Sequence, residues 1–423
     1  MADGLTCAGF ATPLPTWSTS AAPFPRWPRL RLNLLMSNYG DWQFGIYLDG
    51  LTGKRPALPM SYAELERQAE KAMSAQMWSY VAGGAGDERT QRANVRAFEG
   101  WGLMPRMLTA AVERDVSVEL FGRRLATPLL LAPVGVIGLC AGDGHGDLAA
   151  ARAAAATGVP MVASTLTEDP MEAVAAELGQ TPGWFQLYPP ADRELCESLV
   201  GRAEAAGFSA IVVTLDTLTL GWRPRDLALA SFPQLKGLCL ANYTSDPVFR
   251  SRLALPPEED MQAATGQWSR LFGNQRLSWD DLPWLRSLTS LPLLLKGICA
   301  PEDARRAVDA GVDGLWCSNH GGRQANGGLP ALDCLPGVVD AAGTAPVIFD
   351  SGVRSGADVV TALALGARAV GIGRPYAYGL AVGGQAGIEH VLRCMLAELD
   401  LIMAVDGYRS LAALDRDALR RVR

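Results

Sequence analysis

The chain has little of three things: clustered positive charge, histidine, and cysteines spaced in pairs. Its 423 residues carry a net charge of −6, and no run of lysine and arginine is dense enough to form a nucleic-acid-binding face. The 3 histidines and 8 cysteines are dispersed and define no metal-ligand spacing. We therefore expect neither a nucleic-acid partner nor a bound metal.

Long apolar runs are missing as well. The uncharged run at 125–142 is interrupted by Pro and Gly, which favours a buried strand and a Gly-rich loop over a membrane-spanning helix. Because no cysteines form a CxxC pair, they are expected to be reduced and mostly buried in a chain of this length. These features predict a cytoplasmic protein that has no membrane segment.

Residues 1–35 differ in composition from everything after them. They are rich in Pro, Ser and Thr, and they lack the continuous apolar core of a signal peptide. We interpret them as a disordered leader or as an over-extended start with initiation at Met36; a targeting function is the less favoured alternative.

The rest of the chain repeats one pattern. Short apolar runs rich in β-branched residues alternate with amphipathic or Ala-rich segments, several of which end at a glycine such as Gly207, Gly311 or Gly366. Eight such units predict the α/β class and a (β/α)8 TIM barrel, with an open doubly wound sheet as the alternative. The predicted strands are 129–132, 161–163, 184–187, 211–215, 293–295, 314–317, 347–349 and 370–372.

Residues 36–423 are predicted to form one domain, with an N-terminal helical segment at 36–104, the barrel at 105–405 and a C-terminal tail at 406–423. One connection is much longer than the usual loop of a βα unit, because residues 217–291 separate the fourth and fifth strands. This connection carries many aromatic residues, which favours a lid-like loop over the active site; an inter-subunit packing element is the alternative.

Functional side chains of a TIM barrel lie at the C-terminal ends of its strands. Those positions carry a set of mostly polar residues that were not selected by type, which indicates a binding site at this rim. The rim residues are Pro133, Ser164, Gln186, Tyr188, Thr214, Asp216, Lys296, His320, Arg323, Asp350, Gly352, Gly373 and Arg374.

Three groups of rim residues suggest three tasks. The loops at 350–356 and 371–375, after the seventh and eighth strands, are typical phosphate-binding positions, with plain glycine turns as the alternative. Ser164, Gln186, Thr214 and Lys296 supply hydrogen-bonding groups for one edge of a flat polar cofactor, and the lysine could stabilise negative charge on its reduced form.

The third group is catalytic. His320 could act as a base near neutral pH, and Asp216 could orient it and stabilise its charged form. Arg323 and Arg223 could bind a carboxylate through their guanidinium groups. The other two histidines, His145 and His390, have no such neighbours in the sequence and are interpreted as structural.

These motifs resemble one family, the FMN-dependent L-2-hydroxy acid oxidases and dehydrogenases, from about residue 36 to the C-terminus. Within it, the long fourth connection and several short segments are similar to lactate 2-monooxygenase. The family motifs are SNHGGRQ at 318–324 with Tyr80, Gln186-Leu187-Tyr188, Asp216, Lys296 and Asp350-Ser351-Gly352; the segments similar to the monooxygenase are 36–41, 102–107, 143–147 and 221–226.

The resemblance implies that FMN binds at the barrel mouth, with its phosphate at Arg354 and Arg374. It also implies that Tyr80, Arg223 and Arg323 bind the substrate carboxylate and that Tyr188 binds the hydroxyl or keto oxygen. A tryptophan beside the flavin in glycolate oxidase corresponds to Leu166 here, so the substrate-size rules of that enzyme do not transfer. The expected cofactor-binding residues are Pro133, Val134, Gly135, Ser164, Gln186, Thr214, Lys296, Ser318, Asp350, Ser351, Gly352, Arg354, Gly373 and Arg374.

The implied activity is oxidation of a small L-2-hydroxy acid such as L-lactate, with His320 taking a proton from the α-carbon or from the hydroxyl. Lys296 would favour the anionic reduced flavin, and O2 would reoxidise it. Retention of the keto acid would give acetate, CO2 and water, whereas early release would give keto acid and H2O2. The alternatives are that oxidase outcome, an FMN-dependent L-lactate dehydrogenase and, less favoured, a flavin isomerase or sensor. A homo-oligomer, tetramer or octamer, is expected from the family.

Overall fold

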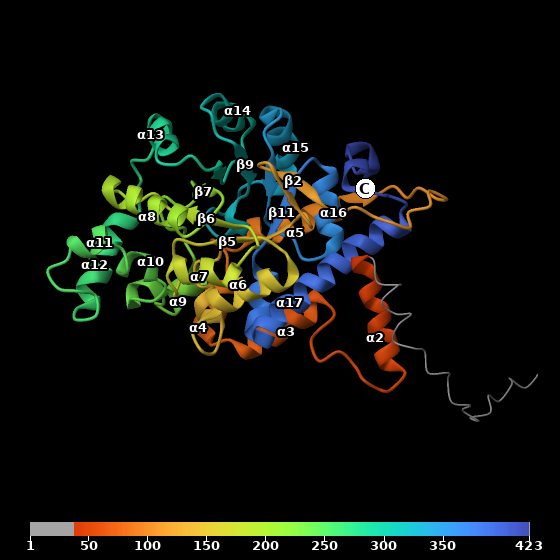
Figure 1. Cartoon of the computed structure of the whole chain (residues 1–423), viewed down its shortest axis with the longest axis horizontal. Coiled ribbons are helices and arrows are strands. Elements are labelled where there is room, and N and C mark those ends of the chain that lie inside the picture. Colours follow the sequence, from red (N-terminus) through yellow and green to blue (C-terminus); the bar gives the residue numbers. More distant parts are fainter. Residues whose placement is uncertain (1–37, 423) are drawn as a thin grey trace, which may run out of the picture. The chain divides into compact units, whose positions relative to one another are not determined.

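The computed structural model describes residues 38–422, so the interpretation of residues 1–35 and of a start at Met36 lies outside the described part. Eight parallel strands close into a barrel in the order β4 to β11, with helices around it (Figure 1). The TIM-barrel prediction is confirmed, and the open sheet is wrong. The strands are β4 Leu129–Leu131, β5 Met161–Ala163, β6 Gly183–Leu187, β7 Ile211–Thr214, β8 Leu293–Lys296, β9 Gly314–Cys317, β10 Val347–Phe349 and β11 Ala369–Ile372.

The barrel interior is filled with side chains. Alternate residues of the strands point inward, and Trp184 and Trp316 meet edge to face inside, with ring centroids 6.5 Å apart. The antiparallel hairpin of β2 (Val118–Leu120) and β3 (Arg123–Leu125) adds Phe121, whose ring lies 5.7 Å from that of Trp184 near the start of β6. Since this hairpin covers the N-terminal end of the strands, the C-terminal end is the one left for a pocket.

The segments between the strands form helices, as the repeated pattern predicts. Gly207, Gly311 and Gly366 have φ of 95°, 83° and 110°, so these glycines adopt the left-handed conformation that ends a helix. The helices of the repeats are α6 Gly146–Thr157, α7 Met171–Leu178, α8 Arg193–Ala205, α14 Pro301–Asp309, α15 Ala331–Ala342, α16 Gly356–Ala364 and α17 Arg374–Val405.

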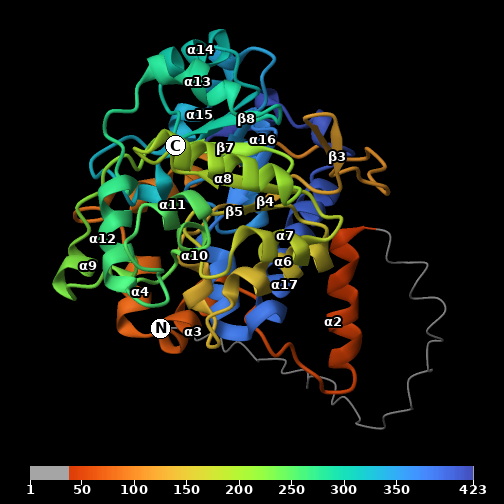
Figure 2. The ribbon, with the colours of Figure 1, turned by 60° about the vertical axis from the view of Figure 1, so that its left-hand side comes forward.

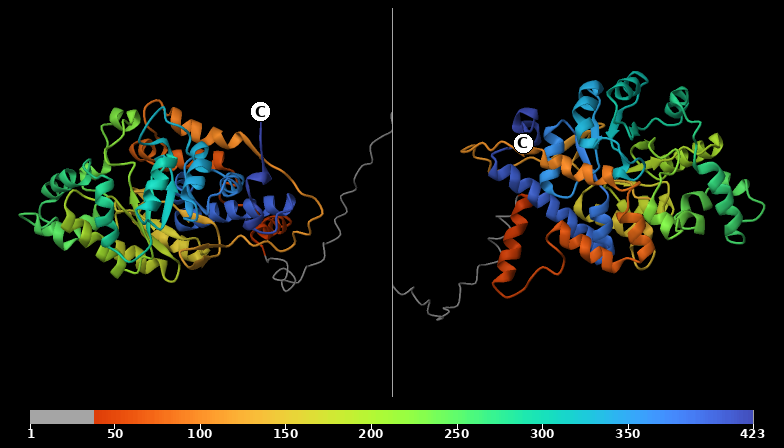
Figure 3. Two further views of the ribbon diagram at one scale, coloured as in Figure 1. Left: turned by 90° about the horizontal axis from the view of Figure 1, so that it is seen from above. Right: turned by 180° about the vertical axis from the view of Figure 1, so that it is seen from behind.

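The N-terminal segment is helical, as predicted. The side chain of Ser61 caps α3 by accepting a hydrogen bond from the backbone N–H of Glu64 (3.4 Å), and α2 lies beside the end of α17 (Figure 3). The elements are η1 Tyr39–Asp41, α2 Trp42–Gly50, α3 Tyr62–Ala72, α4 Ala75–Ala82, α5 Arg89–Glu99 and β1 Trp101–Leu103.

The C-terminal residues are not a free tail. After the short helices η6 (Leu411–Ala413) and η7 (Arg416–Ala418), β12 (Leu419–Arg421) pairs antiparallel with β1 and so ties the end of the chain to the N-terminal segment. Among the described helices, none is both long and apolar enough to cross a bilayer.

The long connection at 217–291 is folded, which corrects its description as a loop. It forms a helical lobe at one side of the barrel (Figures 1 and 2), and Tyr243, Phe249 and Trp268 are buried in it. We call residues 217–291 the helical lobe below. Its elements are α9 Pro224–Ala228, η3 Pro233–Lys236, α10 Ala241–Thr244, α11 Pro247–Ser251, α12 Met261–Phe272, η4 Trp279–Asp281 and α13 Leu282–Ser287.

Candidate active site

A pocket with an empty volume of about 1050 Å³ opens at the C-terminal ends of the strands. Its walls come from the strand ends, from α4 and from the helical lobe. The predicted residues that line it are Tyr80, Pro133, Val134, Gly135, Tyr188, Arg223, Lys296, His320, Arg323, Asp350, Ser351, Gly352, Arg354, Gly373 and Arg374. The predicted residues Ser164, Gln186, Thr214, Asp216 and Ser318 are not among the residues that line it.

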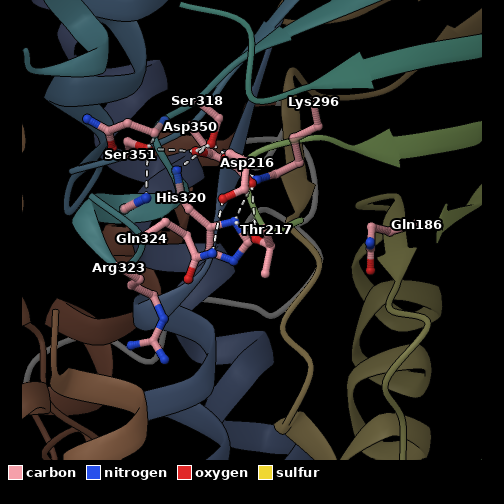
Figure 4. A network of polar contacts seen from close by, with 12 residues as sticks. Gln186, Asp216, Thr217, Lys296, Ser318, His320, Arg323, Gln324, Asp350 and Ser351 are labelled. Atoms are coloured by element: carbon pink, nitrogen blue, oxygen red, sulfur yellow. Dashed lines mark hydrogen bonds and ion pairs between the residues drawn. The ribbon is translucent and has the colours of Figure 1, made fainter. Parts of the chain in front are cut away.

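His320 is held by a carboxylate. Its Nδ1 lies 2.7 Å from Asp216 Oδ1, and Thr217, which the sequence analysis did not identify, lies 3.2 Å from both atoms (Figure 4). Burial raises the pKa of Asp216, but the charges of His320 and Lys296 outweigh it and hold that pKa to about 2. Burial lowers the pKa of His320 more than Asp216 raises it. A neutral imidazole beside an ionised carboxylate leaves Nε2 free to accept a proton.

The backbone of His320 is left-handed, with φ of 57°, which is strained for a residue with a side chain. Three neighbours hold this turn: Ser318 Oγ accepts from His320 N (3.0 Å), Ser351 Oγ from Gly321 N (3.0 Å) and Asn319 Oδ1 from Gly322 N (3.1 Å). The orientation of the imidazole is therefore fixed by its own loop as well as by Asp216.

Lys296 is buried at the end of β8. Its Nζ donates to Ser318 Oγ (3.1 Å) and lies 3.5 Å from Asp350 Oδ2, while Ser318 Oγ donates to Asp350 (2.5 Å). Burial alone would lower the pKa of Lys296, but Asp350 and Asp216 raise it above its usual value. The pocket thus keeps a positive charge beside the base.

Three guanidinium groups, those of Arg223, Arg323 and Arg374, line the same pocket. The first two lie 5.6 Å and 5.0 Å from the centre of the Tyr80 ring. Within residues 38–422, none of the three forms an ion pair with a carboxylate. Burial and the charges of the other two arginines lower the pKa of Arg323 to about 9. Such a cluster is suited to bind an anion.

The residues expected around a flat cofactor fit that task. Gln186 Nε2 and Thr214 Oγ1 are buried and have no hydrogen-bond partner within residues 38–422. Gln186 is oriented by Ser164, whose hydroxyl donates to its Oε1 (3.1 Å), and Thr214 lies beside Lys296 in the sheet. Because buried polar atoms without partners are rare, these atoms fit the hydrogen-bonding edge of a ring such as that of FMN.

The residues expected around a phosphate also fit. Ser351 and Gly352, in the loop after β10, both have φ of 93°. Helix α16 begins at the end of this loop, and helix α17 begins at the end of the loop after β11. The guanidinium of Arg354 lies 4.9 Å from the centre of the Tyr62 ring and, with burial, lowers the pKa of Arg374. Two helix N-termini beside two arginines form a site for an anionic group.

Comparison with known proteins agrees with this geometry. Residues 69–421 match the model of a family described as FMN-dependent dehydrogenase. The chain is 42% identical over 390 residues to an FMN-dependent alpha-hydroxy acid dehydrogenase of Penicillium citrinum, covering 91% of this chain and 96% of that protein. It is 42% identical over 370 residues to an L-lactate oxidase of Lysinibacillus sphaericus, covering 87% and 94%.

Solved structures agree as well. A soluble mutant of the membrane-associated (S)-mandelate dehydrogenase from Pseudomonas putida is similar with a TM-score of 0.77 at 35% identity, covering 86% of this chain and 99% of that one. A putative lactate oxidase of Pediococcus acidilactici gives 0.76 at 34% identity, covering 88% and 97%. The chain therefore belongs to the FMN-dependent dehydrogenase family, and it is an oxidoreductase whose cofactor is FMN.

Proposed function

We propose that the protein oxidises a small L-2-hydroxy acid, with L-lactate as the best candidate, and that O2 is the electron acceptor. The observation that carries this proposal is the His320–Asp216 pair in the same pocket as Arg223, Arg323 and Arg374, which have no carboxylate partner within residues 38–422. A 2-hydroxy acid carries its anionic group on the carbon to be oxidised, so one small molecule meets both features.

Different pocket residues bind the substrate and transfer the proton. Arg223 and Arg323, beside Tyr80, bind the carboxylate, and His320 Nε2 takes a proton from the α-carbon or the hydroxyl. Asp216 stabilises the imidazolium that forms. Burial raises the pKa of Tyr188 above its usual value, so its phenol stays protonated and can donate a hydrogen bond to the substrate oxygen. FMN, when bound, accepts the two electrons, and Lys296 holds a positive charge beside it.

The fate of the product is the finer part of the proposal. We propose that the keto acid stays in the pocket until peroxide decarboxylates it, so that L-lactate and O2 give acetate, CO2 and water. The pocket wall formed by Leu220, Phe232 and Phe272 of the helical lobe supports this outcome, because such a wall can delay release. Leu166, at the position of the glycolate oxidase tryptophan, also lines the pocket and forms an apolar part of its wall.

Product analysis tests this proposal. Purified protein with L-lactate and O2 should give acetate and CO2 in amounts equal to the O2 consumed, with little free H2O2. Stoichiometric pyruvate and H2O2 would instead establish the oxidase outcome. Slow reaction with O2 together with fast reduction of an artificial dye would identify a dehydrogenase.

We also propose a homo-oligomer. Large exposed apolar side chains support it: Phe44 and Tyr47 on α2 are 56% and 68% exposed, and Leu108, between β1 and β2, is fully exposed. Light scattering of the purified protein measures the assembly, and a monomer at micromolar concentration would refute it.

A further inference from the structure

Gln324, the last residue of the 318–324 motif, lies close to Asp216 and His320 (Figure 4), and its side chain joins the backbone of Asp216 to Arg223. Its Nε2 donates to the backbone carbonyls of Asp216 (3.0 Å) and Thr219 (2.9 Å), and its Oε1 accepts from Arg223 Nη2 (2.5 Å). Two acceptors face the nitrogen and a donor faces the oxygen, so the network fixes the orientation of the amide.

The backbone around Gln324 is closely packed against the same turn. A Cβ at Gly221 would lie 2.4 Å from the carbonyl oxygen of Gln324, so only glycine lets the two segments approach this closely. Arg223 Nε also donates to the carbonyl of Arg323 (3.1 Å). The segment that runs from Asp216 to Arg223 therefore rests on the segment that carries His320 and Arg323.

All three guanidinium groups are oriented by neutral acceptors. Arg223 uses the Gln324 amide and the Arg323 carbonyl, Arg323 donates to Gly83 O (2.7 Å), and Arg374 donates to Gly83 O (2.9 Å) and to other uncharged oxygens. A carboxylate at position 324 could orient Arg223 as well, but it would neutralise the charge that the substrate needs. An amide fixes the geometry and leaves the charge free.

We propose that Gln324 is a positioning residue that fixes Arg223 relative to Asp216 without neutralising the arginine, so that a bound carboxylate places its α-carbon at His320. This inference rests on the proposed function, because it requires that Arg223 binds the substrate carboxylate. It extends that function by assigning a role to a residue that contacts neither base nor substrate directly.

The test compares Gln324→Met with Gln324→Glu, measuring the dissociation constant of propionate by calorimetry on FMN-loaded protein. Propionate keeps the carboxylate of lactate and cannot be oxidised at a hydroxyl. Gln324→Met removes the acceptor but leaves the charge of Arg223, and it should weaken binding about tenfold. Like Gln324→Met, Gln324→Glu loses the two donations of Nε2, but it keeps an acceptor for Arg223 and neutralises the charge of that arginine, so it should weaken binding further, about a hundredfold.

Controls separate the possible failures. Gln68→Met makes the same change on α3, where the amide donates to Glu64 outside the pocket, and should bind propionate like the wild type. If Arg223→Met binds propionate normally, the proposed carboxylate site itself is wrong. If Arg223→Met weakens binding while both Gln324 variants stay within twofold of the wild type, only the role of Gln324 is refuted.

The pH profile of kcat/KM for L-lactate is a second measurement, because it shows whether each variant raises or lowers the pKa of His320. The new carboxylate of Gln324→Glu lies near Asp216 and should raise the pKa of His320, moving the base limb to higher pH. Gln324→Met adds no charge and should not move the limb upward. If Gln324→Met shifts the limb as far as Gln324→Glu does, the amide acts on the Asp216–His320 pair and not only on Arg223, and that result would overturn the proposal.

Discussion

The two halves of the pocket treat charge in opposite ways. In the half around the base, both the imidazole and the lysine face a carboxylate, since His320 lies 2.7 Å from Asp216 and Lys296 lies 3.5 Å from Asp350. In the other half, Arg223, Arg323 and Arg374 are oriented by amide and carbonyl oxygens. A paired charge tunes and positions a proton acceptor, whereas a charge with only neutral partners remains available to a ligand.

Removal of the base should give the largest effect. In His320→Ala the cofactor-binding residues are intact, so the protein should stay yellow, but anaerobic reduction of its flavin by L-lactate should slow by about 10³-fold or more. Stopped-flow absorbance measures this rate. His145→Ala is a matched control, because His145 makes a similar 2.7 Å contact with Asp169 but does not line the pocket, and it should react normally. Normal reduction in His320→Ala would show that another group is the base.

Breaking the pair from the carboxylate side should cost less. Asp216→Asn keeps the imidazole but removes the charge that stabilises its protonated form, so turnover should fall by about 10²-fold. Because Asp216 raises the pKa of His320, its loss should lower that pKa, and the base limb of kcat/KM should move to lower pH. An unchanged limb would mean that the carboxylate does not act on the base.

The barrel and the rim were predictable because each depends on local sequence. The strands are fully buried, as in Leu129–Leu131, so each one is a continuous apolar run in the sequence. In a TIM barrel the C-terminal ends of the strands form the rim, so the rim residues follow directly from the strand positions. Asp216 and His320 could be proposed as a pair for that reason, although 104 positions separate them.

Other features depend on contacts between distant segments and left no local signal. Gln324 meets Arg223 and Thr219 across about a hundred residues, and Thr217 reaches His320 only after the strands are in register. The fold of the helical lobe was also missed, because its short helices are stabilised by packing around Trp268 rather than by a repeating pattern. The pairing of β12 with β1 joins the C-terminal end of the described chain to a strand about 320 residues earlier and has no sequence signature either.

In the half of the pocket that holds the three arginines, Arg323→Met should weaken propionate binding by about 10-fold to 100-fold. The rate of flavin reduction at saturating lactate should change little. The wild type should show a related pH effect. Since the pKa of Arg323 is lowered to about 9, the free protein loses this charge above that pH, and propionate affinity should fall there. Calorimetry at pH 7.5 and 9.5 measures both. Affinity that stays constant in the wild type would mean that Arg323 keeps its charge at pH 9.5, whereas normal binding in Arg323→Met would mean that this guanidinium does not bind the anion.

The carboxyl of Asp147 is buried outside the pocket. Asp147, at the start of α6, accepts from Glu168 N (2.8 Å) through one oxygen, and its other oxygen has no partner within residues 38–422. Asp216 faces cations and has a low pKa, whereas burial raises the pKa of Asp147 to about 7. The folded protein therefore holds a proton that the unfolded chain releases at lower pH.

Because the pKa of Asp147 is raised in the folded protein, a rise in pH destabilises the folded state relative to the unfolded chain. The contribution of Asp147 to stability is fully present below the unfolded pKa and is lost as pH rises through about 7. Asp147→Asn cannot ionise, so the difference in unfolding free energy between variant and wild type should shift in favour of the variant by about 2 kcal/mol from pH 5.5 to 8.5. Denaturant unfolding at both pH values measures this difference. A difference that is the same at both would mean that Asp147 is already ionised at pH 5.5, and that a buried carboxylate in this fold needs no cation beside it.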